Sequence, residues 1–233
     1  MIIPVFVALM LNAPAPSVTK TPSWGDAGVL AASTAAYFVL HSRQTPFFEP
    51  AWEGTERGLS YKEDSVPTAT FYAWGAGLSL AAGLEGGQLE AFAPLQTLAV
   101  TGLSTELLKY SFGRPRPDYN NRLSLFAESN ESKLLRDGRL SMPSGHASSA
   151  FALALHTGMW WHRASCRRGF GRASIAAGYT LPLLSAVAIG WSRITDNRHN
   201  PSDVLVGAVL GLGVSYAVNR IHFGAPGSCD SKR

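Results

Sequence analysis

Six apolar segments, each longer than a typical buried strand, constrain the fold of this chain most strongly. They comprise residues 27–40, 66–84, 91–108, 147–161, 173–191 and 204–218. Apolar runs of this length favour helices over strands. Their many Ala and Gly residues suit close packing between helices. We therefore predict an all-α fold, a helical bundle of about six apolar helices.

Length and composition support a single apolar domain. The chain has 233 residues, of which 15% are charged and 46% hydrophobic, whereas soluble domains carry about 25% charged residues. We predict a signal-like or anchoring segment over residues 1–23, the helical domain over 24–222 and a polar tail over 223–233. The net charge of +4 is modest, and the basic residues form no stripe with interleaved aromatics. We therefore expect no nucleic-acid partner.

The apolar segments also suggest a membrane partner. Two are long enough to cross a bilayer, while several fall short of the roughly 20 residues that a full span needs. We expect a bundle embedded in a membrane, with a soluble helical bundle as the alternative. In the membrane, residues 162–172 and the basic tail would lie on one side and the polar clusters described below on the other. The positive-inside rule makes the basic side cytoplasmic.

The N-terminus resembles a secretory signal in part. An apolar run over residues 2–11 precedes Ala13-Pro14-Ala15, but the usual positive n-region is missing. A cleaved signal followed by six spans would place the polar clusters inside, against the charge bias. Two alternatives remain. The protein is an uncleaved protein of the inner (cytoplasmic) membrane with its site facing the periplasm or exterior, or it is secreted to the periplasm and soluble.

The most informative polar cluster covers residues 192–203. Asn200 and Pro201 are typical of an N-cap and first helical position, so His199 should lie just ahead of a helix N-terminus, which favours anions. Asp203 can reach back to one imidazole nitrogen of His199. Arg193 would offer a planar donor fork to phosphate oxygens. A His/Asp metal pair is an alternative, but no third ligand is near in sequence, and we predict no metal.

A second cluster, Pro143-Ser-Gly-His146, has a similar design. Ser144 can cap a helix that begins near Ala147, and Gly145 allows the backbone to approach an anion closely. His146 at the same helix end could protonate a leaving oxygen. Taken alone, this tetrapeptide could equally be an ordinary capped helix.

The remaining cluster lies at the end of an apolar segment. Lys109 precedes helix-breaking Gly113 and Pro115, and Arg116 follows in an extended stretch. Two cations held together favour an anion between them, although a pair of interfacial cations is an alternative. Arg114 also precedes a proline, so these residues by themselves leave the choice between Arg114 and Arg116 open. The polar linker over residues 118–140 joins this cluster to Pro143-Ser-Gly-His146, and we expect it to shape the entrance to the site.

Together the clusters resemble the type 2 phosphatidic acid phosphatase (PAP2) superfamily, which includes lipid phosphate phosphatases, bacterial acid phosphatases and vanadium haloperoxidases. Its pattern is Lys-x6-Arg-Pro, Pro-Ser-Gly-His and Ser-Arg-x5-His-x3-Asp. The resemblance covers about residues 66–220. The matching residues are Lys109, Arg116, Pro117, Pro143, Ser144, Gly145, His146, Ser192, Arg193, His199 and Asp203.

The resemblance implies a catalytic role for three of these residues. His199 would form a phosphohistidine, Asp203 would orient it, and His146 would protonate the leaving alcohol and later activate water. The phosphoryl group would be held without a metal or another cofactor, because fixed cations can replace Mg²⁺ in stabilising its charge. The implied phosphate-binding residues are Lys109, Arg116, Ser144, Gly145 and Arg193.

The expected function is therefore metal-independent hydrolysis of a phosphate monoester or diphosphate. The expected substrates are lipids such as phosphatidate, phosphatidylglycerophosphate or isoprenyl diphosphate. A soluble periplasmic acid phosphatase of broad specificity is the alternative. A vanadium haloperoxidase and a non-catalytic helical membrane protein are more distant alternatives.

Overall fold

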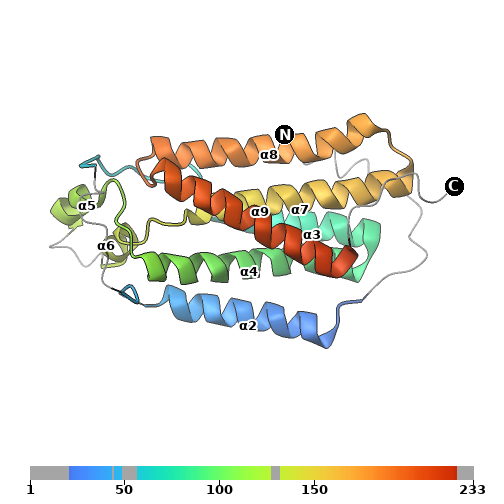
Figure 1. Ribbon diagram of the computed structural model, residues 1–233, viewed down its shortest axis with the longest axis horizontal. Coiled ribbons are helices and arrows are strands. Elements are labelled where there is room, and N and C mark those ends of the chain that lie inside the picture. Colours follow the sequence, from blue (N-terminus) through green and yellow to red (C-terminus); the bar gives the residue numbers. More distant parts are fainter. Residues whose placement is uncertain (1–20, 44, 49–56, 127–131, 225–233) are drawn as a thin grey trace.

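The computed structural model describes residues 21–43, 45–48, 57–126 and 132–224, and these contain helices and no strands (Figure 1). The all-α prediction is confirmed. The predicted N-terminal segment and polar tail lie largely outside the described residues. The helices are α2 (Trp24–His41), α3 (Ala69–Gly86), α4 (Gln88–Phe112), α5 (Tyr119–Phe126), α6 (Ser132–Gly138), α7 (Gly145–Arg168), α8 (Arg172–Thr195) and α9 (Pro201–Phe223).

The six long helices correspond to the six apolar segments, and most extend further than the segments do. Polar end signals account for the added turns. Ser23 caps α2 in a capping box with Asp26, and Gly169 ends α7 in the left-handed region, with φ of 70°. The polar linker over residues 118–140 is partly helical, because it contains the short helices α5 and α6.

Helix α7 lies at the centre of the bundle and packs against α3, α4, α8 and α9. Its Leu153, Trp160 and Trp161 form a buried cluster with Phe71 and Leu78 of α3. Contact between α7 and α9 is especially close, because glycines of α9 face the α7 backbone. A Cβ atom on Gly211 would lie 2.1 Å from the backbone oxygen of Ser148. These two helices carry two of the three clusters, so their spacing sets the geometry between them.

We expect Gly211→Ala to destabilise the fold by about 1–3 kcal/mol, because α7 and α9 must move apart to admit the methyl group. Gly213 is a matched control: it lies two residues further along α9, and a Cβ there would meet nothing within 4 Å. Gly213→Ala should be neutral or slightly stabilising, since alanine is the better helix former. Thermal unfolding of both variants in one detergent tests this. Equal unfolding midpoints for the two would contradict the prediction.

The connections divide between the two ends of the bundle (Figure 1). The α4–α5, α6–α7 and α8–α9 connections, which carry the three clusters, share one end, and the α7–α8 connection lies at the other. Basic residues of the second end pair with buried acids: Arg163 with Glu90 at 2.7 Å, and Arg168 with Glu85. Part of the positive charge behind the predicted orientation is therefore neutralised locally, and the orientation stays a prediction.

Candidate active site

The cluster over residues 192–203 forms the link between α8 and α9. Asn200 is the N-cap of α9 and Pro201 its first residue, as predicted. His199 directly precedes this cap and is buried, and its amide donates to the carbonyl of Arg193 at 3.2 Å. This hydrogen bond ties the last turn of α8 to the start of α9. His199 is thus held between two helix ends rather than in a free loop.

Asp203 contacts His199 less directly than the sequence suggested. Its Oδ2 lies 3.9 Å from Nδ1 of His199, beyond hydrogen-bonding distance. That oxygen accepts instead from the amide of Asn200 at 2.8 Å and the hydroxyl of Ser141 at 2.7 Å. The Ser141 hydroxyl is also 3.4 Å from Nδ1 of His199. Ser141 therefore lies between the imidazole and the carboxylate, and no sequence pattern had singled it out.

The two arginines that precede prolines have different partners. Nη1 of Arg114 donates to Oδ1 of Asp203 at 2.7 Å. Arg116 donates from Nε to the carbonyl of Asp137 and from Nη2 to its carboxylate, both at 2.8 Å. Nη1 of Arg116 reaches the carbonyl of Arg198 at 3.3 Å. Arg114 therefore braces Asp203, while Arg116 lies beside the backbone that leads into His199.

The first and second clusters meet at the N-terminus of α7. Ser144 caps this helix, with its hydroxyl accepting from the amide of Ala147 at 3.4 Å. The Ser144 amide donates to the carbonyl of Asp203 at 2.9 Å. A Cβ atom on Gly145 would lie 3.5 Å from Nζ of Lys109. The lysine ammonium, paired at 3.0 Å with Glu106 of its own helix, therefore lies beside the open backbone of Gly145.

His146 is held by the loop that precedes α3. Its Nε2 lies 2.9 Å from the carbonyl of Val66. Because a carbonyl only accepts, Nε2 carries the hydrogen and donates it. The His146 and Phe71 rings pack in a T-shaped contact, with their centroids 5.2 Å apart. Burial, together with the positive charge of Arg193, lowers the pKa of His146 to about 4.

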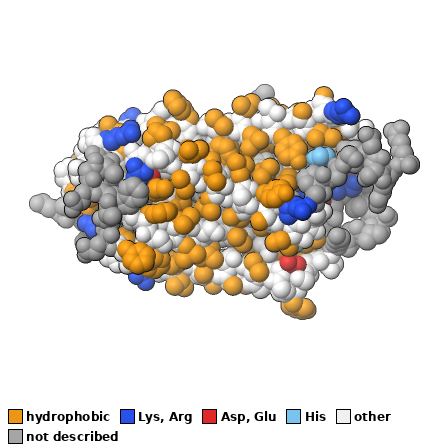
Figure 2. Space-filling model, in the orientation of Figure 1, with side chains coloured by type: hydrophobic (Ala, Val, Ile, Leu, Met, Phe, Trp, Pro, Cys, Tyr) orange, Lys and Arg blue, Asp and Glu red, His pale blue; other side chains and the backbone are white. Residues whose placement is uncertain are grey.

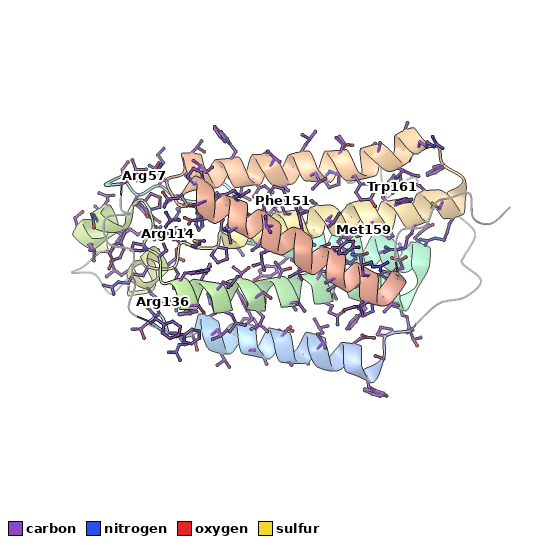
Figure 3. The ribbon with its side chains drawn as sticks, viewed as in Figure 1. Arg57, Arg114, Arg136, Phe151, Met159 and Trp161 are labelled. Carbon is purple, nitrogen blue, oxygen red and sulfur yellow. The ribbon has the colours of Figure 1, made fainter. Side chains whose placement is uncertain are left out.

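The cations gather around His199. Burial lowers the pKa of His199 well below its ordinary value, and the positive charges of Arg116, Lys109 and Arg193, with that of His146 when it is protonated, lower the pKa further. A neutral imidazole surrounded by fixed cations suits a nucleophile that attacks an anion. The structure thus brings all eight predicted site residues together at one end of the bundle. Figure 3 shows Arg114 at this end, with Met159 and Trp161 at the other.

Within the described ranges, no three His, Cys, Asp or Glu side chains come together in a way that could hold a metal ion. The cationic side chains instead pair with carboxylates. Arg193 donates to Asp64 at 2.9 Å and to Asp196 at 2.7 Å. Arg116 is paired with Asp137 at 2.8 Å. Each of these two buried arginines therefore faces an anion, as buried cations require.

The lowered pKa of His146 gives a pH-dependent stability. The folded-state pKa is about 4 and the ordinary value 6.5, so between these values the unfolded chain binds more protons than the folded one. The contribution of His146 is fully present above pH 6.5 and is lost as the pH falls toward 4. We expect His146→Gln to flatten the decline of the unfolding midpoint over this range. Unfolding scans from pH 4 to 7 test this, and an unchanged decline would contradict it.

Comparison with protein families identifies the family to which the chain belongs. The family model described as "PAP2 superfamily" matches residues 90–226. This match includes all three clusters and more than half of the chain. The chain belongs to the PAP2 superfamily.

Individual relatives match over shorter stretches. A PA-phosphatase related-family protein of Dictyostelium discoideum is 33% identical over 132 residues, 55% of this chain and 46% of the relative. The "Probable diacylglycerol pyrophosphate phosphatase 1" of Schizosaccharomyces pombe is 33% identical over 148 residues, 54% of this chain and 50% of the relative. The lipid A 1-phosphatase of Porphyromonas gingivalis is 36% identical over 115 residues, 49% of this chain and 20% of the relative. The chain thus spans half or less of these relatives. No solved structure matches it significantly.

Proposed function

We propose that this protein is a metal-independent phosphatase that hydrolyses a phosphate monoester or diphosphate of a membrane lipid. The observation that carries the proposal is the placement of His199, buried and surrounded by Lys109, Arg116, Arg193 and His146 at one end of the bundle. Phosphoryl transfer needs chiefly an aligned nucleophile and fixed positive charge. The relatives named above are a PA-phosphatase related-family protein, a probable diacylglycerol pyrophosphate phosphatase and a lipid A 1-phosphatase. Their names agree with a lipid phosphate as the substrate.

In the proposed reaction, Nε2 of His199 attacks phosphorus, because Nδ1 faces Ser141 and Asp203. A P–N bond forms while the P–O bond to the leaving alcohol breaks, and protonated His146 gives its proton to the departing oxygen. Water then attacks the phosphohistidine and passes a proton to His146. The P–N bond breaks, and inorganic phosphate leaves.

The low pKa of His146 bears on the first of these steps. A bound phosphate brings negative charge to a site where Arg193 now opposes protonation. Negative charge beside an imidazole raises its pKa. In the proposed cycle the substrate therefore helps to charge the acid that will protonate its own leaving group, while His199 stays neutral. This combination implies a bell-shaped dependence of turnover on pH.

A membrane location is supported by the outer surface of the bundle. Helices α8 and α9 are long and apolar enough to cross a bilayer, with mean hydropathy of 1.5 and 1.6. Figure 2 shows hydrophobic side chains over the middle of the molecule, with most charged ones toward its ends. The exposed hydrophobic side chains of α8 and α9 include Leu184, Val187, Trp191, Leu205 and Val209. Large contiguous apolar surfaces are rare on soluble monomers, so we favour the inner membrane, with the site facing the periplasm or exterior.

The test is phosphate release in the presence of EDTA, with phosphatidate, phosphatidylglycerophosphate, undecaprenyl diphosphate and a soluble aryl phosphate as substrates. The proposal expects turnover of at least one lipid and a clear preference over the aryl phosphate. Turnover of the aryl phosphate alone would instead indicate the soluble acid phosphatase. Loss of all turnover in EDTA that returned with added metal would overturn the metal-independent mechanism.

A further inference from the structure

A segment before α3 crosses the candidate site and is fixed to both sides of it. We call residues 57–67 the strap. The amides of Arg57 and Leu59 donate to the carbonyl of Pro117, both at 3.2 Å. At the other end, the Ser65 hydroxyl donates to Asp196 at 2.6 Å. The strap therefore connects the Arg-Pro cluster to the α8–α9 connection (Figure 1).

The strap places one carboxylate on two arginines. Oδ1 of Asp64 lies 2.9 Å from Nη1 of Arg193 and 2.8 Å from Nε of Arg198. The arginine side chains are only 1% and 6% exposed, whereas that of Asp64 is 38% exposed. Buried guanidinium groups require a counter-charge. Arg193 also has Asp196 at 2.7 Å, but the counter-charge that it shares with Arg198 comes from an accessible side chain on a loop, which an incoming anion can replace at low cost.

Arg198 is bound less completely than Arg193. Its contact with Asp64 has the distance of an ion pair without the alignment of a hydrogen bond, and its buried Nη1 has no hydrogen-bond partner among the described residues. The guanidinium lies 4.8 Å from the centre of the Tyr61 ring, also in the strap. Arg198 thus has buried N–H donors that lack a hydrogen-bond acceptor within the described chain, and it lies beside Arg193. A buried donor without an acceptor costs free energy, and a phosphate oxygen would supply the acceptor.

We propose that Arg198 is a further ligand of the substrate phosphate, and that Asp64 holds the place of that phosphate on Arg193 and Arg198 until the substrate displaces it. The proposal rests on the proposed function and adds to it an exchange of one anion for another. It also implies that the strap shifts as Asp64 leaves. Arg198 lies outside the matched family pattern, which specifies Ser192, Arg193, His199 and Asp203 within residues 192–203.

The test measures the affinity of the full chain for inorganic phosphate and orthovanadate. Two readouts are used: the inhibition constant against the preferred substrate, and the rise of the unfolding midpoint caused by phosphate, which needs no turnover. We expect Asp64→Asn to bind both anions about three- to tenfold more tightly, because the competing charge is gone. Glu63→Gln removes the same charge from an exposed neighbour in the strap and should leave both readouts unchanged. Asp64→Glu should return the affinity toward the wild-type value.

Arg198 is tested in the same assays. Arg198→Gln should weaken phosphate and vanadate binding about tenfold, the usual effect of losing a charge-assisted hydrogen bond. Arg57→Gln is the matched control, since Arg57 is an exposed arginine at the other end of the strap (Figure 3). It should bind both anions like the wild type.

Several results would overturn the inference. Weaker anion binding by Asp64→Asn, or its failure to fold, would make Asp64 a structural brace for Arg193. Wild-type affinity for phosphate in Arg198→Gln would show that Arg198 is not a ligand. An equal gain of phosphate affinity in Glu63→Gln would show that the effect of Asp64→Asn comes only from the overall charge of the chain. If the wild-type chain showed neither turnover nor stabilisation by phosphate, the proposed function would fail as well. If it showed both while the Asp64 and Arg198 variants behaved like it, only this inference would fail.

Discussion

His199→Ala is expected to reduce phosphate release by at least about 10⁴-fold, because it removes the atom that would form the covalent intermediate. The remaining cations can still bind the substrate, so the loss should fall on kcat much more than on KM. The measurement is steady-state turnover of the preferred lipid, together with trapping of the labelled phosphoenzyme in acid-free quench. The wild type should accumulate label and His199→Ala none.

His162→Gln provides the control for this substitution. His162 is half-buried near the end of the bundle opposite His199, where its Nδ1 lies 3.3 Å from the Tyr179 hydroxyl. It should leave turnover and labelling within about twofold of the wild type, as expected for a substitution away from the site. Residual turnover above one-hundredth of wild type in His199→Ala would remove His199 from the role of nucleophile.

Arg116→Gln is expected to impair turnover, whereas Arg114→Gln is expected to lower folding stability. Arg116 donates a hydrogen bond to the backbone carbonyl of Arg198, and its positive charge acts on the neighbouring His199, whose pKa it lowers. Its loss should lower kcat/KM by about 10²–10³-fold, the usual effect of removing a donor that stabilises transition-state charge. Arg114 instead holds the fully buried Asp203 at 2.7 Å. Its loss leaves a buried carboxylate short of a partner, which should cost about 3–5 kcal/mol of folding stability.

Two measurements on each variant separate these outcomes: kcat/KM for the preferred substrate, and the unfolding midpoint. Arg116→Gln should show the larger kinetic loss and Arg114→Gln the larger drop in midpoint. The assignment fails if Arg116→Gln retains full turnover while Arg114→Gln abolishes it at a temperature where both are folded. In that case the shorter Lys-to-Arg spacing would be the functional one.

Helix positions could be predicted from the sequence because apolar length and end signals act locally. The Asn200-Pro201 start of α9 and the Ser144 cap of α7 both lie where their chemistry places them. The short helices α5 and α6 escaped prediction because their sequences are polar with scattered leucines. Their order depends on long-range contacts, such as that of buried Arg122 in α5 with the Leu134 carbonyl of α6 at 3.1 Å.

That the eight candidate residues lie together at one end of the bundle could likewise be predicted, but their hydrogen-bond and ion-pair partners could not. The spacing of His199 and Asp203 suggested a direct contact, whereas Ser141, more than fifty residues earlier, lies between them. The two arginines of Arg-Pro-Arg-Pro look alike in sequence, and only the packing of the α4–α5 connection on α9 directs Arg114 to Asp203. Asp64 belongs to no motif at all.

The sequence by itself determined the helical class of this protein, its membership of the PAP2 superfamily and the eight residues that converge at one end of the bundle. The helical class follows from the length of the apolar segments and their end signals, and the family and its site residues follow from the match to the PAP2 sequence pattern. Only the tertiary structure decided which anion faces each buried cation, since a charge taken out of water must be compensated by whichever group the fold brings near. The fold pairs Asp64 with Arg193 and Arg198, Asp137 with Arg116, and Glu106 with Lys109.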